Sequence, residues 1–320
     1  MKRVAVMVVF LMVSVLYSTA WAEDYGVYVK AVEKIAAPFD EVVKSVETAL
    51  TKRGMDVLAS YNASVPQGCR FKAHTIVFNS HDYASKLSSH GVNAAFALPL
   101  RIGIYTDAKG VNVSFLNPSS INRTALGDGT EKQLSVNMMK DLSTLLASAV
   151  TGSVVDRQIG EIRSKGRVGG RGGGDFVEKV MVIKKVADSG KAFDDTVTKV
   201  KEGLSSNPQG WRLVYQTVLP NGAVVFGTNK AATEAKAFEI AGERRESSDN
   251  SCPGIDHASA FPVEVVVYRE GGQVKVVLLD EMYRMKVYFE DAGNWAFMKN
   301  MSMPGQIEKE ITAAATSKLK

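Results

Sequence analysis

Apolar residues recur with a helical period in two stretches of the chain, and both stretches begin with Phe-Asp. In residues 39–54 and 193–210 the apolar positions fall on one face of a helix. The members of these faces are Phe39, Val42, Val43, Val46, Ala49 and Leu50 in the first stretch, and Phe193, Val197, Val200 and Leu204 in the second. Gly54 and Gly210 suit the C-terminal ends of the two helices. The pattern predicts two similar amphipathic helices, one in each half of the chain.

A second likeness lies downstream, between residues 98–118 and residues 261–281. Pro99 aligns with Pro262 and Tyr105 with Tyr268, at a constant offset of 163 residues. Each copy has a β-branched, partly alternating run, a short polar turn (TDAKG or REGGQ) and a second such run. This pattern is typical of a β-hairpin.

Further segments repeat between these two. The runs MDVLASY and WRLVYQTVL predict strands, and TIVFNSHDYASKL matches AVVFGTNKAATEA as a strand leading into a helix, which aligns Phe78 with Phe226. Helical sequence also closes each half, at residues 131–150 and 304–319. We therefore expect an α+β fold of two similar two-layer α/β sandwich domains in tandem. Each domain would be a small sheet with a β-hairpin, covered by helices.

The start of the chain has the three parts of a secretory signal peptide. Lys2 and Arg3 precede the apolar run VAVMVVFLMVSVLY, and Ala20-Trp21-Ala22 is an A-x-A cleavage signal. The apolar run is shorter than the roughly 20 residues that span a bilayer, although a retained anchor is the alternative. We expect cleavage near Ala22 and a protein that is periplasmic or secreted. No later segment is apolar and long enough to predict a membrane span.

A glycine-rich segment separates the halves. Residues 163–175, RSKGRVGGRGGGD, hold six glycines in thirteen positions and predict a flexible linker in which nothing can pack a core. The expected organisation is a signal peptide at 1–22, a first repeat domain at 23–162, a linker at 163–175 and a second repeat domain at 176–320. The formal charge of +5 falls to +3 when Lys2 and Arg3 are removed, which does not favour a nucleic-acid partner.

The chain has two cysteines, Cys69 and Cys252, at non-equivalent places in the two halves. In an oxidising compartment such a pair indicates one disulfide, which would join the halves. Two separate thiols, at least one of them buried, are the alternative.

The repeated pattern, F-D-E-V-V…L…G followed by P-x-R-I-x-I-Y…G-V-x-V…N-P, resembles the family called domain of unknown function 302, here in tandem. The first half is more similar to the family, while the second has Glu264 in place of Arg101 and Asp280-Glu281 in place of Asn117-Pro118. Single members often carry a Cys directly after the Pro, where this chain has Leu100 and Val263, so a role for that Cys is not carried over. The resemblance implies a compact α+β domain with helices on one face of a sheet, and no established reaction.

A methionine cluster is the candidate metal site. Five methionines fall within 22 residues (Met282, Met285, Met298, Met301 and Met303), and FMKNMSM has the spacing M-x-x-M-x-M. Thioethers are soft ligands that select Cu(I), so Met298, Met301 and Met303 are candidate ligands. The alternative is that these methionines fill gaps in a core beside aromatic residues.

Other chemistry-bearing residues give weaker signals. The four histidines are His74, His81, His90 and His257. The spacing of His81 and His90 does not suit a shared metal on a helix, although His81 with Asp82 could belong to a pocket. Residues 243–259 read as a long polar insertion of the second half, in which Cys252 and His257 could form a thiol site. No known catalytic motif is present, and Asp or Glu pairs at helix starts are explained by the helix dipole.

These observations predict an exported, non-enzymatic binding or accessory protein of unknown ligand, with the site in the groove between the repeats. A periplasmic Cu(I)-handling protein using the methionine cluster is one alternative. An enzyme of unidentified chemistry is the other, and a nucleophile within hydrogen-bond reach of a base would favour it.

Overall fold

The computed structural model describes residues 24–170, 172–206, 209–240, 251–292 and 298–319. It contains two antiparallel sheets, one formed by each half of the chain, and each is packed against helices. The predicted α+β class with two similar sandwich domains is therefore confirmed.

The described residues of the first half form eleven elements. They are β1 (Tyr25–Ile35), α1 (Phe39–Lys52), β2 (Asp56–Asn62), β3 (Ala73–Asn79), α2 (His81–Ser88), the 3-10 helix η1 (Val92–Phe96), β4 (Leu100–Asp107), β5 (Gly110–Leu116), α3 (Pro118–Leu126), α4 (Lys132–Ala149) and β6 (Ser153–Arg163).

The second half repeats this order after a short 3-10 helix. Its elements are η2 (Phe176–Lys179), β7 (Val180–Ala187), α5 (Ala192–Ser205), β8 (Trp211–Val218), β9 (Val224–Lys230), α6 (Ala231–Phe238), η3 (Ile255–Ala260), β10 (Val263–Glu270), β11 (Gln273–Leu279), α7 (Glu281–Phe289) and α9 (Ser302–Thr316).

The two sheets have the same topology. The first has the strand order β2-β3-β4-β5-β1-β6 and the second β8-β9-β10-β11-β7, so each strand of the second sheet has a counterpart in the first. The first sheet adds β6 as an edge strand beside β1. The tandem repeat read from the sequence is thus a repeat of the whole topology.

The strand register corrects one predicted alignment. Ile76 pairs with Ile102 in the first sheet, and Phe226 pairs with Val265 in the second. Because Ile102 and Val265 are related by the hairpin offset of 163, the structural counterpart of Phe226 is Ile76. The alignment of Phe226 with Phe78 was therefore wrong by two residues. Sequence similarity alone carries no information on which residues of neighbouring strands are paired.

Local chemistry accounts for how the helices begin. The buried residues of α1 recur at helical spacing, and Asp40 and Glu41 occupy its first turn, where carboxylates oppose the helix dipole. The Asn117 side chain caps α3 by accepting from Ser119 N at 3.0 Å. Asp280 at the equivalent position caps α7 by accepting from Tyr283 N at 2.8 Å. The change from Asn-Pro to Asp-Glu therefore keeps the capping role.

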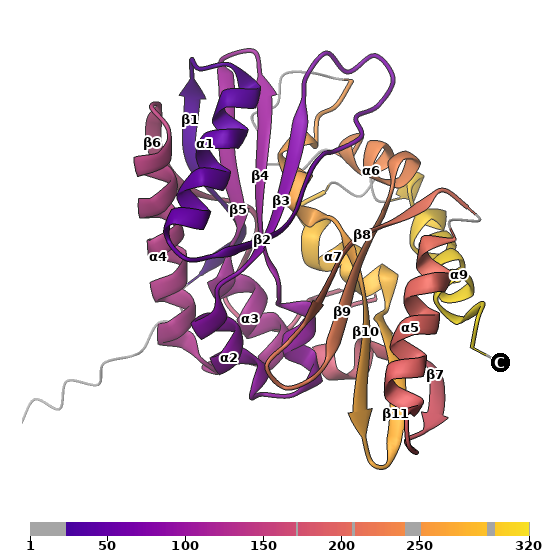
Figure 1. The fold of residues 1–320 in the computed structure, drawn as a ribbon. Coiled ribbons are helices and arrows are strands. Elements are labelled where there is room, and N and C mark those ends of the chain that lie inside the picture. The colour runs from indigo at the N-terminus through magenta and orange to yellow at the C-terminus, as the bar shows by residue number, and fades with distance from the viewer. Residues whose placement is uncertain (1–23, 171, 207–208, 241–250, 293–297, 320) are drawn as a thin grey trace, which may run out of the picture.

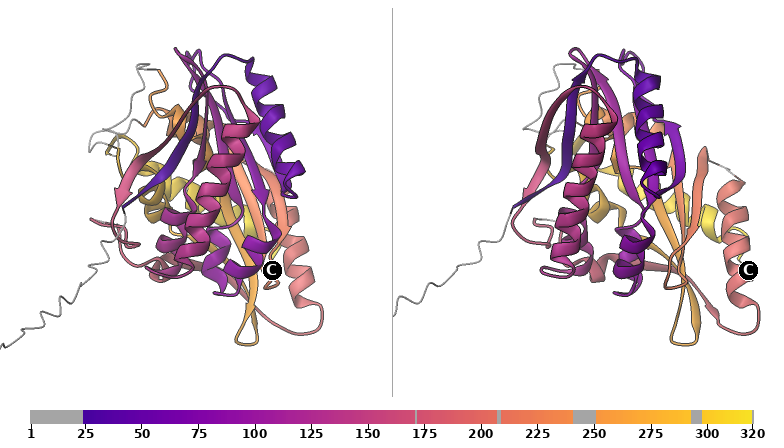
Figure 2. Two further views of the ribbon diagram at one scale, coloured as in Figure 1. Left: turned by 90° about the vertical axis from the view of Figure 1, so that its left-hand side faces the viewer. Right: turned by 60° about the vertical axis from the view of Figure 1, so that its left-hand side comes forward.

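Four helices lie on the outer sides of the two sheets, whereas α7 lies between the domains and contacts β6 of the first. In Figure 1, α1 and α4 cover the first sheet on the left and α5 and α9 cover the second on the right. The other two views show the same arrangement from the side (Figure 2). The 3-10 helix η3 packs on β3, β4 and β5 of the first sheet, and η1 contacts β10 of the second. One hydrophobic cluster therefore extends through both domains.

The glycine-rich segment is not only a spacer. Val168 is 1% exposed and belongs to the main hydrophobic cluster, so the prediction that nothing in this segment packs into a core is wrong. A Cβ on Gly166 would lie 2.1 Å from Arg123 O, so a glycine is required where the segment passes α3.

The predicted signal peptide lies outside the described residues. Among the helices that the structure describes, none combines the length and the apolar character needed to cross a membrane.

Candidate functional site

A buried ion pair joins the two domains at equivalent positions. Arg101 on β4 and Glu264 on β10 bond to each other, and their side chains are 1% and 3% exposed. Since the two positions correspond in the repeat, the contact lies where an axis relating the two copies would pass. Identical copies would bring two like charges together here, so the change from Arg to Glu makes the two halves complementary.

A second guanidinium shares the same carboxylate. Arg284 Nε lies 3.8 Å from Glu264 Oε2, and Arg284 also donates to the carbonyl oxygens of Ala260 and Pro262. Arg101 donates to the Ala260 carbonyl at 3.2 Å. The Tyr288 ring lies under both cations, at 4.9 Å from Arg284 and 5.9 Å from Arg101. Two guanidinium groups share one carboxylate here, which leaves one positive charge in excess. The backbone carbonyls and the Tyr288 ring stabilise that charge.

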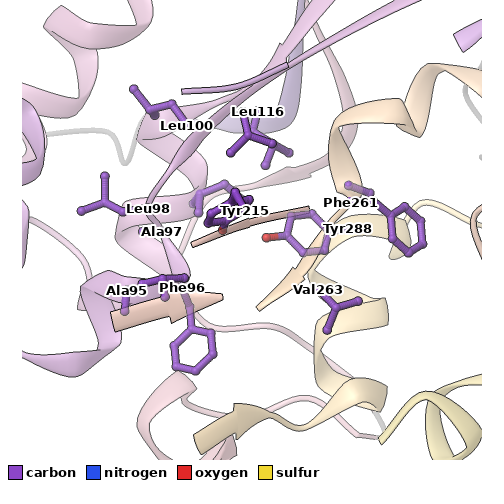
Figure 3. Close-up of a cluster of buried hydrophobic side chains, with 14 of the residues drawn as sticks. Ala95, Phe96, Ala97, Leu98, Leu100, Leu116, Tyr215, Phe261, Val263 and Tyr288 are labelled. Atoms are coloured by element: carbon purple, nitrogen blue, oxygen red, sulfur yellow. The ribbon is translucent and has the colours of Figure 1, made fainter. Parts of the chain in front are cut away.

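The groove predicted between the repeats is filled at its centre. Figure 3 shows Phe96, Leu98 and neighbouring residues of the first domain beside residues of the second domain. These partners, Tyr215, Phe261, Val263 and Tyr288, are all buried. The centre of the interface is therefore a packed core. A small hollow of about 50 Å³ lies at its edge, between first-domain residues such as Lys30 and Tyr105 and the second-domain residues Ile255 and Asp256.

The structure joins Cys69 and Cys252 in a disulfide across a sequence separation of 183 residues. Cys252 is fully buried in a small cluster with Phe238 and Ile255. A sulfur held in this bond is not a thiolate, so the structure does not support a Cys252–His257 nucleophile.

The predicted long insertion is partly structured. Residues 241–250 lie outside the described residues, but Ile255–Ala260 form η3, which is fully buried against the first sheet. His257 is buried in η3, where its Nδ1 lies 3.0 Å from Gly254 O and its ring centroid 4.4 Å from that of Phe289. The segment corresponds in position to η1, which also precedes the hairpin. Its role in the structure is therefore to fill the interface between the domains.

The three candidate metal ligands differ in how exposed their side chains are. Met298 and Met301 are exposed, at 61% and 49%, whereas Met303 packs against the core. In the described parts of the chain, no group of three or more His, Cys, Asp or Glu side chains is placed to hold a metal ion.

The remaining three histidines lie at separate places in the first domain and have different surroundings. His81 begins α2 and is exposed, and Asp82 lies in the first turn of that helix. His90 pairs with Glu131 at 3.0 Å. His74 on β3 bonds to the side chains of Ser60 and Asn62 on β2.

A buried carboxyl near the disulfide was missed by the sequence analysis. Glu234 on α6 accepts from Ser64 N of the first domain at 3.1 Å and from Asn229 Nδ2 at 3.2 Å. Burial raises the pKa of Glu234 to about 7, against the lowering effect of these hydrogen bonds and of Arg212. This carboxyl ties α6 to the first domain, close to the loop that carries Cys69.

A hollow lies on the outer side of the first domain, between α1 and α4. It has a volume of about 760 Å³. The lining residues are Glu41, Lys44, Ser45, Thr48, Ala49, Lys52, Arg53, Asp141, Thr144, Leu145, Ser148 and Ala149. We call this hollow the α1–α4 groove. Its walls are mixed, with hydroxyl and charged groups around a small apolar floor.

The equivalent helices of the second domain pack too closely for such a groove. Gly203 on α5 corresponds to Ala49 on α1, and a Cβ on Gly203 would lie 2.2 Å from Ala314 O of α9. Glycine thus brings α5 and α9 into contact, whereas Ala49 faces the larger Leu145 of α4. At this position, therefore, the described helices of the second domain lie closer together than α1 and α4 do.

Comparison with known proteins identifies the first domain. Residues 30–148 match the family model described as the domain of unknown function DUF302. No curated protein matches the chain. Among solved structures, an uncharacterised conserved DUF302 protein from Bacillus stearothermophilus is 14% identical, with a TM-score of 0.34, and the match covers 39% of this chain and 98% of that one. The di-domain ARO/CYC StfQ from the steffimycin biosynthetic pathway is 10% identical, with a TM-score of 0.20, over 92% of this chain and 97% of that one. Residues 30–148, which make up most of the first domain, are therefore similar to the DUF302 family.

Proposed function

We propose that this chain is an exported binding protein whose ligand lies in the α1–α4 groove of the first domain. The observation that carries the proposal is the groove itself, about 760 Å³ in volume, at a place where Gly203 brings the described helices of the second domain close together. Ligand pockets are roughly 300–1,000 Å³ in volume, so the size suits a small molecule. We prefer this groove to the interface between the repeats as the binding site, because the centre of that interface is packed.

Two features support export. The first 22 residues have the pattern of a secretory signal, and disulfides such as Cys69–Cys252 persist mainly in oxidising compartments. A location in the periplasm or outside the cell is therefore part of the proposal.

The groove walls indicate the ligand's chemistry. Lys44, Lys52 and Arg53 supply three positive charges, and Glu41 and Asp141 supply two negative ones, a balance of 3 − 2 = +1. The hydroxyls of the serines and threonines offer hydrogen bonds along both helices. We infer an elongated, hydroxyl- or amide-bearing small molecule of weak negative charge.

A side chain that fills the groove should remove the ligand. Thr48 is exposed in the middle of the α1 wall, so Thr48→Trp should occupy the space that the ligand needs. Lys140→Trp is the matched control, because Lys140 is exposed on α4 and does not line the groove. We expect native mass spectrometry of protein from its native compartment to show a mass excess in wild type and control that is lost in Thr48→Trp.

The same measurement can contradict the proposal in two ways. A bare wild-type mass would mean that the chain does not retain a small ligand. An equal mass excess in all three proteins would place the ligand outside the α1–α4 groove.

A second candidate function is Cu(I) handling, favoured by the exposure of Met298 and Met301. Core-filling methionines are buried, so these two thioethers do not fit that interpretation. Cu(I) would be cargo here, held by Met298, Met301 and Met303.

We expect one Cu(I) per chain and at least a tenfold loss of affinity in Met298→Leu/Met301→Leu. Leucine keeps the size and apolar character of the side chains and removes the sulfur. The control is Met285→Leu, because Met285 is 4% exposed and lies in the core. Unchanged Cu(I) affinity in the double variant, measured by competition with a Cu(I) chelator, would contradict this function.

We also propose that the second domain descends from the same family. The support is the identical strand order and the equivalent caps Asn117 and Asp280.

A further inference from the structure

A serine hydroxyl lies within hydrogen-bond distance of a histidine on the outer side of the first sheet. Ser60 Oγ on β2 is 2.6 Å from His74 Nε2 on β3. The strand register produces this contact, because Asn62 pairs with His74 and Ser60 lies two residues away on the same face of β2. Ser60 is exposed, so its hydroxyl is accessible from solvent.

The same histidine is oriented by a third side chain. His74 Nδ1 lies 2.8 Å from Asn62 Oδ1. An amide oxygen only accepts hydrogen bonds, so Nδ1 carries the proton and donates it. Nε2 is then the unprotonated nitrogen, and it accepts from the Ser60 hydroxyl. Ser60, His74 and Asn62 therefore form a hydrogen-bonded chain of a nucleophile, a base and a group that orients the base.

The surroundings keep the imidazole neutral. Burial lowers the pKa of His74 below its ordinary value of 6.5, against the opposing influence of Glu47 and Asp40 on α1. The Phe39 ring packs edge-on against the imidazole, with ring centroids 6.4 Å apart, and the Lys72 ammonium lies 5.7 Å from the centre of that ring. A neutral imidazole is the form that can take a proton from a hydroxyl.

The fold itself does not require these three residues. Through the shared strand register, Ser60, Asn62 and His74 correspond to Gln216, Val218 and Val224 in the second domain. Val224 is buried at the position of His74, so an apolar side chain suffices there for folding. The polar set is specific to the first copy, as expected of residues kept for chemistry.

We propose that Ser60, His74 and Asn62 form a hydrolytic site that cleaves carboxylic esters through an acyl-serine intermediate. Ser60 Oγ bonds to the ester carbonyl carbon while its proton passes to His74 Nε2. The ester C–O bond then breaks, and the departing alkoxide takes that proton and leaves as an alcohol. Water next attacks the acyl carbon and gives a proton to His74. That proton returns to Ser60 Oγ as the carboxylic acid is released.

The position on an edge strand indicates the substrate class. Ser60 and Asn62 are both exposed, and the Phe39 ring forms an apolar wall beside the histidine. Such an open site suits small acyl groups and leaving groups that need little stabilisation, which favours esters over amides. The activity goes beyond the proposed binding function and uses the other flank of α1, the one that contacts β2.

Labelling and hydrolysis with the full chain test the proposal. We expect a fluorophosphonate probe to label Ser60, located by peptide mass spectrometry, and p-nitrophenyl acetate to be hydrolysed. Ser60→Ala should remove both signals, and His74→Val, which copies the second domain, should lower kcat about 100-fold. Ser89→Ala is the control, because Ser89 is an exposed serine whose hydroxyl bonds only to the Lys86 carbonyl among the described contacts.

Asn62 is a positioning residue, and its variants separate chemistry from folding. Asn62→Val should lower kcat about tenfold with KM unchanged, whereas Asn62→Asp should restore activity. A carboxylate beside His74 would also raise the pKa seen in the pH–rate profile, which in wild type should lie below 6.5. If the contact were merely structural, these variants would change neither kcat nor the pKa of the pH–rate profile. The proposal is overturned if Ser60 is not labelled, or if Ser60→Ala hydrolyses the ester at the wild-type rate.

Discussion

Removal of the Cys69–Cys252 bond should lower the free energy of unfolding by about 3 to 5 kcal/mol. The bond closes a loop with a sequence separation of 183 residues, for which the chain-entropy estimate is about 5 kcal/mol. It also fastens η3, which fills the interface, to the loop between β2 and β3. Guanidinium chloride unfolding of Cys69→Ala/Cys252→Ala and of the oxidised wild type gives this difference directly.

Reduced wild-type protein is the control that isolates the cross-link. It keeps both sulfur atoms, so the difference between reduced protein and the double alanine variant reports the packing of Cys252. We expect the reduced protein to account for most of the loss. A loss below about 1 kcal/mol on reduction would mean that the hydrophobic core already holds the domains together without the bond.

Local patterns made the paired elements of the fold predictable. The helical period of α1, with Val42, Val46 and Leu50 buried, and the alternation within the two hairpins are properties of short windows. The strands β1, β6 and β7 lacked such a signal. β1 is buried at almost every position, so it has no alternation, and β1 and β7 join their sheets beside strands far away in sequence.

The candidate sites depend on contacts between residues that are far apart in the sequence. Ser60, Asn62 and His74 meet because β2 and β3 pair in one register, and the intervening loop gives no indication of that register. At the α1–α4 groove, Ala49 stands where the second domain has Gly203, and a Cβ on Gly203 would collide with the backbone of α9. Gly203 lies in the last turn of α5, where a glycine is also common for local reasons, so the sequence alone does not reveal its close approach to α9.

The exchange of Arg101 for Glu264 between the two copies can be read from the sequence, but the contact between these residues cannot. Glu264 in place of Arg101 was noted as a departure from the family pattern, whereas the structure shows that the two residues bond to each other. Repeats that occupy both sides of an interface can diverge in this way, because a change in one copy is compensated in the other. The ion pair also fixes which surfaces of the two domains meet.

Glu264→Gln should therefore destabilise the protein by about 3 to 5 kcal/mol, although it changes neither size nor shape. The neutral amide would leave two buried guanidinium groups, Arg101 and Arg284, without their shared carboxylate. The loss should appear as a lower midpoint in guanidinium chloride, with the disulfide intact.

A double-mutant cycle with Arg101→Met tests whether the pair acts as a unit. Removing one guanidinium relieves the charge that Glu264→Gln leaves unpaired, so the double variant should lose less than the sum of the single losses by at least about 1 kcal/mol. Arg284 can then still be stabilised by the Ala260 and Pro262 carbonyls and by the Tyr288 ring. Additive losses would show instead that each charge is stabilised separately, and that the exchange of Arg for Glu between the copies did not create a coupled contact.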